Sequence, residues 1–244
     1  MMLALDIGNT RVKWGLRGGG GWRESGATDT RPLGTLPQRL ATLPRAASVA
    51  YCNVAGRGGE RAVGALSRRW AARCLRIAPM AASCGVRNGY QEIGQLGSDR
   101  WAALVAAWSM VRAPAVVVNA GTAATMDLLD GDGLFLGGII CPGIGLMLES
   151  LRRRSRVLRA DAGRVEPLPR DTASAMKTGA MTALVGAVEM MAGRLEAHCT
   201  SKPVIVLSGG DAPLLTGFAS ERIVRVENLV LEGVALIADE ALRR

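Results

Sequence analysis

Residues 3–14 read Leu-Ala-Leu-Asp-Ile-Gly-Asn-Thr-Arg-Val-Lys-Trp, and this stretch decides the fold. An apolar run ends at Asp6, a Gly-Asn-Thr turn follows at 8–10, and an alternating segment over 12–16 leads away from it. The pattern is typical of a β-hairpin whose small turn residues let the backbone approach a ligand closely. Backbone N–H groups at such a turn suit phosphate, and the adjacent carboxylate suits a metal ion that accompanies phosphate. Most Gly-Asn turns are only turns, so the motif by itself does not assign a function.

A second copy of the motif occurs at 116–127, which reads Val-Val-Val-Asn-Ala-Gly-Thr-Ala-Ala-Thr-Met-Asp. Asn119 matches Asp6, and Gly121 matches Gly8. The offset is about half the chain, which indicates two related domains rather than a solenoid. Two phosphate-binding hairpins facing each other across a cleft would form an ATP clamp.

Length and cysteine content narrow the class of protein. The 244 residues, 49% of them hydrophobic, can form one large or two small domains with substantial cores. No apolar run reaches the roughly 18 residues of a membrane span and no leader pattern opens the sequence, so we expect neither a span nor export. The cysteines are scattered without C-x-x-C spacing, which indicates reduced, mostly buried thiols in a cytoplasmic protein; they are Cys52, Cys74, Cys84, Cys141 and Cys199.

The net charge of +9 raises the question of nucleic-acid binding. Only three of the thirty basic residues are lysines, and the chain has two Phe and two Tyr. An arginine bias of this kind follows from genome composition, so we expect no nucleic-acid partner. The basic charge would instead attract anionic nucleotide substrates.

The remaining pattern alternates strands and helices. Strands are predicted at 48–54 and 74–77 with a helix at 60–72 between them, which favours an α/β layer. A domain boundary is predicted at 112–114, and the apolar segment at 229–238 predicts a final helix that packs on the second sheet. A buried-type strand at 204–208 enters a Gly-Gly turn, a common way to bring backbone against a nucleoside.

A further helix is predicted from Ser98, with Asp99 and Arg100 in its first turn. Asp99 could simply complement the helix dipole and pair with Arg100. Alternatively, a carboxylate there could accept a proton from a substrate hydroxyl while Arg100 holds an anionic group. The segment itself favours neither interpretation.

Seven motifs, in order along the whole chain, resemble those of the type III pantothenate kinases, a family that includes proteins called Bvg accessory factor. They are Asp6-x-Gly8-Asn9-Thr10, Asn88-Gly89-Tyr90, Gly97-Ser98-Asp99-Arg100, Asn119-x-Gly121-Thr122-Ala123-x-Thr125, Gly137-Gly138-x-Ile140-x-Pro142-Gly143, Thr172 to Gly179, and Ser208-Gly209-Gly210-Asp211.

The resemblance implies two duplicated actin-like ATPase domains (ASKHA, ribonuclease H-like) with a cleft between them, at 1–112, carrying the pantothenate-site helix, and 113–244. It implies ATP-dependent phosphorylation of pantothenate to 4'-phosphopantothenate, the first step of coenzyme A biosynthesis. The implied partners and cofactors are pantothenate, ATP, Mg²⁺ and a monovalent cation (K⁺ or NH₄⁺). A cytoplasmic homodimer without nucleic-acid or membrane partners is expected.

The resemblance also implies roles for individual residues. Asp99 is the implied catalytic base, and Asp6 lies near the Mg²⁺. ATP is contacted by Asp6, Ile7, Gly8, Asn9, Thr10, Arg11, Val12, Lys13, Gly121, Thr122, Ser208, Gly209, Gly210 and Asp211. Pantothenate is bound by Tyr90, Gly97, Ser98, Asp99, Arg100 and Thr172.

Asn119 departs from the family pattern, which has Asp at this position in association with the monovalent cation. Asn keeps an oxygen ligand but loses the charge. Two alternatives therefore stay open: a catalytically weak, regulatory or partner-binding member of the family, and a kinase of the same superfamily for another small hydroxylated substrate. Because phosphoryl transfer depends mostly on positioning and electrostatics, we expect activity to be retained.

Overall fold

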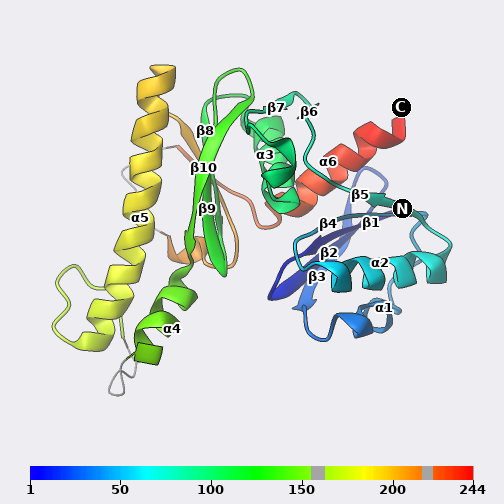
Figure 1. The fold of residues 1–244 in the computed structure, drawn as a ribbon, viewed down its shortest axis with the longest axis horizontal. Helices are drawn as coiled ribbons and strands as arrows, with labels where there is room; N and C mark the ends of the chain where they lie inside the picture. The colour runs from blue at the N-terminus through cyan, green and yellow to red at the C-terminus, as the bar shows by residue number, and fades with distance from the viewer. Residues whose placement is uncertain (155–162, 216–221, 244) are drawn as a thin grey trace. The chain divides into compact units, whose positions relative to one another are not determined.

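The computed structural model describes residues 1–154, 163–215 and 222–243 (Figure 1). The chain divides into two compact units, one formed by Met1–Met110 with Asn228–Arg244 and the other by Val111–Glu227. Strands and helices occur together in each unit, which confirms the predicted α/β class. The domain limits 1–112 and 113–244 stay a prediction.

The first unit is built on a mixed sheet of order β3-β2-β1-β4-β5. Its antiparallel part is β1 (Met2–Ile7), β2 (Arg11–Gly18) and β3 (Gly21–Asp29), whereas β4 (Ser48–Asn53) and β5 (Arg73–Arg76) run parallel to β1. Parallel pairing brings the carboxyl ends of β1 and β4 together at one edge, with Asp6 beside Cys52 and Ile7 beside Asn53.

One face of this sheet is covered by α1 (Leu36–Arg39) and α2 (Arg57–Trp70) (Figure 1). Alternate residues of β1, including Leu3, Leu5 and Ile7, point into this core and meet Leu66 of α2. The intervening residues, Asp6 among them, point to the opposite face. The alternation therefore separates the hydrophobic core from the acid that the sequence singled out.

The final helix, α6 (Leu229–Arg243), packs against β1 and β4 of the first unit, so the prediction that it packs on the second sheet is wrong. Its Gly233 lies so close to α3 (Ser98–Val111) that an added Cβ would be 1.8 Å from the Ala102 carbonyl oxygen. An ion pair between Arg17 and Asp239 (2.7 Å) further attaches α6 to the first sheet. The apolar pattern predicted a buried helix, but the small residues that receive it lie far away in the sequence.

A short hairpin and two 3₁₀ turns also belong to the first unit and precede α3. Strands β6 (Ala82–Ser83) and β7 (Val86–Asn88) form an antiparallel hairpin, and the 3₁₀ turn η2 (Ile93–Gln95) follows. A further 3₁₀ turn, η1 (Leu33–Thr35), leads into α1. The helix predicted from Ser98 is confirmed as α3, which is buried from Arg100 to Trp108.

Five strands of the second unit repeat the first topology. They are β8 (Ala115–Ala120), β9 (Ala123–Leu129), β10 (Leu134–Pro142), β11 (Val204–Ser208) and β12 (Ile223–Arg225), and their order β10-β9-β8-β11-β12 matches β3-β2-β1-β4-β5. As in the first unit, three strands are antiparallel and two run parallel to the central strand. The duplication inferred from the two sequence motifs is therefore confirmed at the level of topology.

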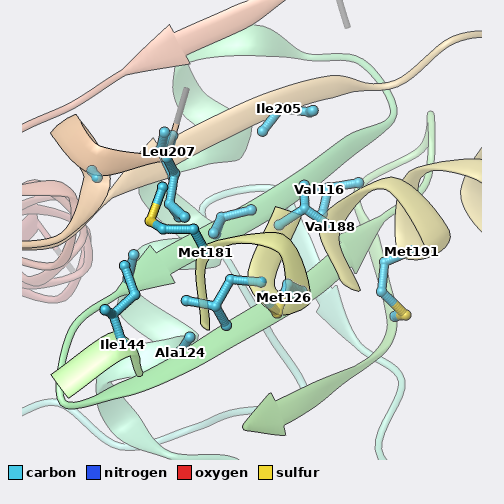
Figure 2. Packing of buried hydrophobic residues seen from close by; sticks show 14 of the residues in the cluster. Val116, Ala124, Met126, Ile144, Met181, Val188, Met191, Ile205 and Leu207 are labelled. Atoms are coloured by element: carbon cyan, nitrogen blue, oxygen red, sulfur yellow. The ribbon is translucent and has the colours of Figure 1, made fainter. Parts of the chain in front are cut away.

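Helices α4 (Ile144–Arg154) and α5 (Thr172–Cys199) complete the second unit, with a 3₁₀ turn η4 (Ala212–Leu214) after β11. Figure 2 shows Val116 of β8 and Ile205 of β11 with Val188 of α5 in the core of this unit. None of the helices in the described ranges has the length and hydropathy of a membrane span. Of the five cysteines, Cys52 is buried, Cys74 is exposed, and Cys84, Cys141 and Cys199 are half-buried, so the prediction of mostly buried thiols is wrong.

Candidate active site

The turn between β1 and β2 at residues 8–11, the first hairpin corner, is fixed by hydrogen bonds to Gly8 and has an exposed tip. Gly8 donates its N–H to the Arg11 carbonyl (3.0 Å), and the buried Thr30 donates its hydroxyl to the Gly8 carbonyl (2.7 Å). Asn9, Thr10 and Arg11 at the tip are exposed. A fixed backbone with an exposed tip is the arrangement that phosphate binding by this corner requires.

Asp6, near the end of β1, lies within range of the negative charge of Asp99 in α3. Burial and the negative charge of Asp99 raise the pKa of Asp6 to about 6. The Cys52 thiol, whose Sγ lies 3.3 Å from Asp6 Oδ1, and the charge of Lys13 act in the opposite direction. The structure thus brings two predicted site acids together within the first unit.

The proximity of a second acid bears on the two interpretations of Asp99. Complementing the dipole of α3 needs an acid in the first turn, which Asp99 supplies. It does not need another carboxylate nearby, and such a pair is unfavourable unless a cation or proton is shared. Paired acids with a perturbed pKa are typical of functional sites.

Gly97 leaves room for the Asp99 carboxylate. Asp99 Oδ1 accepts a hydrogen bond from the Arg100 N–H (2.9 Å), and it lies 2.5 Å from the position that a Cβ on Gly97 would occupy. Any side chain at residue 97 would therefore displace this carboxylate. The glycine in the Gly-Ser-Asp-Arg motif is explained by this contact.

Arg100 and Tyr90 form a second feature of the first unit. Arg100 is 6% exposed, its Nη1 donates to the Tyr90 hydroxyl (3.1 Å), and its guanidinium lies 5.7 Å from the centre of the Tyr90 ring. The contact fixes the plane of the guanidinium. A buried and oriented guanidinium can bind a carboxylate in bidentate fashion.

Three backbone segments converge at the end of β8 in the second unit. The Gly121 N–H donates to Ala123 O (3.1 Å), and the Gly143 N–H donates to Thr122 O (2.9 Å). The Asp211 N–H donates to Ala120 O (3.0 Å). Gly209 adopts φ +104°, and a Cβ there would be 2.0 Å from Ala120 O, so this turn requires glycine.

Asn119 lies in β8 beside Thr125 of β9 and Ser208 of β11. Residues paired across neighbouring strands share a face of the sheet, so three neutral oxygen-bearing side chains are adjacent. Burial raises the pKa of Asp211, which follows β11. The described residues contain no group of three or more His, Cys, Asp or Glu side chains that could hold a metal ion by themselves.

The predicted site residues divide between the two units. Asp6 to Lys13, Tyr90 and Gly97 to Arg100 lie in the first, while Asn119, Gly121, Thr122, Thr172 and Ser208 to Asp211 lie in the second. The structure joins Asp6 with Asp99, Tyr90 with Arg100, and the Gly121 corner with the Gly209 turn. Thr172 is the first residue of α5, and the Asp171 side chain caps that helix by accepting the Ser174 N–H (2.9 Å).

Sequence reasoning missed Thr30, Cys52 and Asn53. Thr30 supports the first corner, Cys52 contacts Asp6, and the Asn53 N–H donates to the Ser98 hydroxyl (3.3 Å). A usable signal existed for the last two, because the strand predicted at 48–54 ends there. Had it been paired in parallel with the first strand, its end would have been placed beside Asp6.

The arrangement of strands and helices is the actin-like fold, which two solved proteins share. A solved protein of Campylobacter jejuni described as a Baf family transcriptional activator superposes with a TM-score of 0.66 at 20% identity, covering 99% of this chain and 100% of that one. MreB 5 of Spiroplasma citri, solved with AMPPNP, gives a TM-score of 0.56 at 9% identity and covers 99% of this chain and 97% of its own. At these identities the likeness shows the fold.

The chain belongs to the type III pantothenate kinase family, whose model matches residues 2–194. A type III pantothenate kinase of Aromatoleum aromaticum is 41% identical over 240 residues, which are 98% of this chain and 98% of the relative. One from Nitrosospira multiformis is 40% identical over 240 residues, covering 98% and 92%. The resemblance inferred from the seven motifs is confirmed, and the chain is a member of an ATP-using kinase family.

Proposed function

We propose that this protein transfers the γ-phosphoryl group of ATP to the primary hydroxyl of pantothenate, giving 4'-phosphopantothenate and ADP in the first step of coenzyme A biosynthesis. The observation that carries the proposal is that Asp99, in the first turn of a buried helix, lies close enough for its charge to raise the pKa of Asp6, which burial also raises. Family membership supports pantothenate as the acceptor.

In the proposed reaction, Asp99 accepts the hydroxyl proton as the pantothenate oxygen attacks the γ-phosphorus in line. The bond from that phosphorus to the bridging oxygen breaks, and ADP leaves with the electron pair. Arg100, held by Tyr90, binds the carboxylate of pantothenate, and Gly97, Ser98 and Thr172 line the rest of its site. The two glycine-threonine corners bind the phosphates, and the turn at 208–211 lies by the nucleoside.

Asp6 is the residue that would hold Mg²⁺. The local chemistry fits a hard divalent cation, because two carboxylates lie close enough to raise the pKa of Asp6 and a cation would relieve their repulsion. When bound, Mg²⁺ supplies positive charge that offsets the charge of the transferred phosphoryl group. Asp6 would hold the ion, while the Cys52 thiol donates a hydrogen bond to Asp6 and the charge of Lys13 favours its ionised form.

A monovalent cation, K⁺ or NH₄⁺, is proposed at Asn119, where the neighbouring Thr125 and Ser208 add neutral oxygen donors. The missing charge at residue 119 weakens the attraction for the cation without removing the ligand type. We also propose that the protein is a cytoplasmic homodimer that binds neither nucleic acid nor membranes.

The deciding experiment is a coupled ADP-release assay on the purified protein. We expect ADP formation that depends on pantothenate, increases with K⁺, and does not occur with acetate or simple sugars. ADP formation with a sugar or acetate but not with pantothenate would reassign the acceptor. Failure to turn over any of these would favour the weak, partner-binding alternative.

A further inference from the structure

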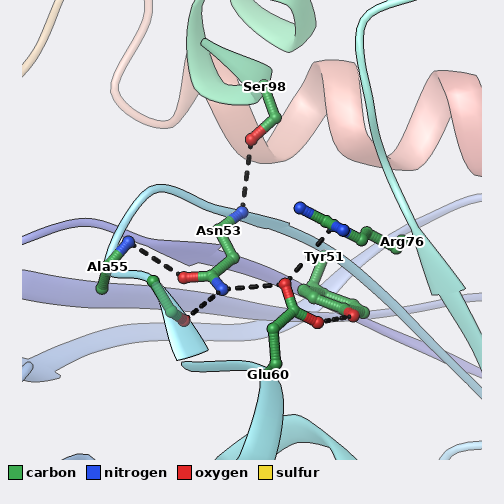
Figure 3. Close-up of polar contacts among 7 residues, drawn as sticks. Tyr51, Asn53, Ala55, Glu60, Arg76 and Ser98 are labelled. Atoms are coloured by element: carbon green, nitrogen blue, oxygen red, sulfur yellow. Dashed lines mark hydrogen bonds and ion pairs between the residues drawn. The ribbon is translucent and has the colours of Figure 1, made fainter. Parts of the chain in front are cut away.

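Asn53 ends β4 with every hydrogen-bonding group of its side chain engaged. Its Oδ1 accepts the Ala55 N–H (2.9 Å), and its Nδ2 donates to the Gly56 carbonyl (2.9 Å) and to Glu60 Oε1 (2.9 Å) (Figure 3). A side chain that satisfies its own turn in this way fixes the backbone conformation of that turn. The β4–α2 connection is therefore held from within.

Glu60 anchors this turn to the sheet. It accepts hydrogen bonds from Asn53 and from the Tyr51 hydroxyl (2.5 Å), and it forms an ion pair with Arg76 (3.3 Å) (Figure 3). Tyr51 and Asn53 are two residues apart in β4, so their side chains lie on the same face of the sheet. This is the face that packs against α2, the helix that carries Glu60.

Two glycines permit the Asn53 contacts, one through its backbone conformation and one through its lack of a side chain. Gly56 adopts φ +73° and ψ −157°, a conformation that is essentially restricted to glycine. A Cβ on Gly59 would lie 2.4 Å from Asn53 Oδ1. A side chain at residue 59 would displace the Asn53 amide, whereas one at residue 56 would strain the backbone whose carbonyl accepts from Asn53.

The fixed turn is connected to the reacting centre through the backbone. The Asn53 N–H donates to the hydroxyl of Ser98 (3.3 Å), the first residue of α3 (Figure 3). Asp99 directly follows Ser98. Cys52, which precedes Asn53, points to the opposite face of the sheet and contacts Asp6 of β1. The end of β4 therefore contacts Asp6 through Cys52, and it contacts Ser98, the residue before Asp99, through the Asn53 N–H.

We propose that Asn53 is a positioning residue for Asp99: its side chain fixes the β4–α2 turn so that its N–H holds Ser98, and with it the first turn of α3, at the end of β1. The role of Asp99 in this inference rests on the proposed function. The part of the inference that concerns the position of α3 does not. Glu60 takes part as the anchor of the Asn53 amide.

The test combines kinetics of the full chain with hydrogen exchange. Asn53→Ala is expected to lower kcat about 10- to 100-fold, the range that a misplacement of about 1 Å produces, with the KM for ATP changed by less than about twofold. Amides of the first turn of α3 are expected to exchange faster. Asn53→Asp places a carboxylate against Glu60 and should be as slow, whereas Asn53→Asp with Glu60→Gln restores a donor and should regain part of kcat.

Leu66→Ala is the matched control, because it removes a fully buried side chain of α2 and destabilises the same unit without touching the turn. It should lower the unfolding temperature and leave kcat of the folded protein close to that of the wild type. A wild-type kcat in Asn53→Ala, a loss no larger than that of Leu66→Ala, or unchanged exchange in α3 would overturn the proposal. A wild-type protein without pantothenate-dependent turnover would refute the proposed function, and the exchange data, which need no substrate, would still decide the role of Asn53.

Discussion

The two hairpin corners of this protein share a scaffold and differ in charge. Both follow the middle strand of a repeated five-strand arrangement, and both contain a glycine with a threonine one or two residues later. The first corner follows Asp6, whose pKa is raised by burial and by Asp99. The second follows Asn119, which lies among neutral side chains and beside a turn that only glycine can form.

The difference shows how one duplicated motif serves two tasks. The first corner follows an acid that is under the influence of a second carboxylate, which suits the divalent cation and the proton acceptor proposed there. The second packs backbone segments closely, so its contribution is N–H groups and carbonyls rather than charge. Variants that move charge between the corners test this division.

The largest effect is expected from Asp99→Asn, which keeps the shape of the side chain and removes the proton acceptor. We expect kcat to fall by about 10² to 10⁴, the usual contribution of a general base. Steady-state ADP release at saturating substrates measures it, with Asp132→Asn, at an exposed acid, as the control. Full turnover in Asp99→Asn would remove Asp99 from this role.

Asp6→Asn makes the first corner resemble the second. Activity should fall by at least the roughly 10- to 100-fold that residues supporting a metal ligand typically contribute. Because the change removes a buried charge that faces Asp99, the Mg²⁺-free protein should unfold at a higher temperature. Thermal denaturation in a chelator checks this, and a lower unfolding temperature would contradict the electrostatic account.

Asn119→Asp makes the second corner resemble the first. The added carboxylate should increase the affinity for K⁺ about two- to fivefold, as expected for about 0.5 to 1 kcal/mol of charge interaction. Titration of turnover with K⁺ measures the change, and Asn119→Ser, which keeps an oxygen without the charge, is the matched variant. An Asn119→Asp protein with unchanged K⁺ dependence would place the cation elsewhere.

The smallest effect is expected at Glu60, which anchors the β4–α2 turn in the same unit as the first corner. Burial opposes ionisation of Glu60, but hydrogen bonds from Tyr51 and Asn53 and the charge of Arg76 outweigh it and lower its pKa. The group therefore adds stability above its ordinary pKa of about 4.5, and this stability is lost as the pH falls through the lower folded-state value.

Wild type and Glu60→Gln should accordingly differ in unfolding free energy by about 0.5 to 1 kcal/mol at pH 7, because the carboxylate is about a third exposed. The difference should shrink as the pH is lowered below 4.5. Chemical denaturation at several pH values measures it. A difference that is independent of pH would mean that the ionised form of Glu60 is not what stabilises the turn.

Much of the fold and part of the site could be predicted from local patterns. The corner at 8–10 and the helix at Ser98 are specified by neighbouring residues, so the sequence predicted them correctly. The packing of α6 on the first sheet was not predictable, because it depends on Gly233 meeting Ala102, a remote residue. Asn53 was missed for a similar reason, since its importance arises from a contact with Ser98, a residue remote in the sequence.

By itself, the sequence determined the duplicated motif, the alternation of strands and helices and the family, since these depend on residue types at short spacings. Only the tertiary structure decided which strand ends meet, that the charge of Asp99 acts on Asp6, and that the end of β4 contacts both Asp6 and Ser98. The physical reason is that burial, charge proximity and pKa depend on side chains brought together by packing, and these are separated by tens of residues along the chain.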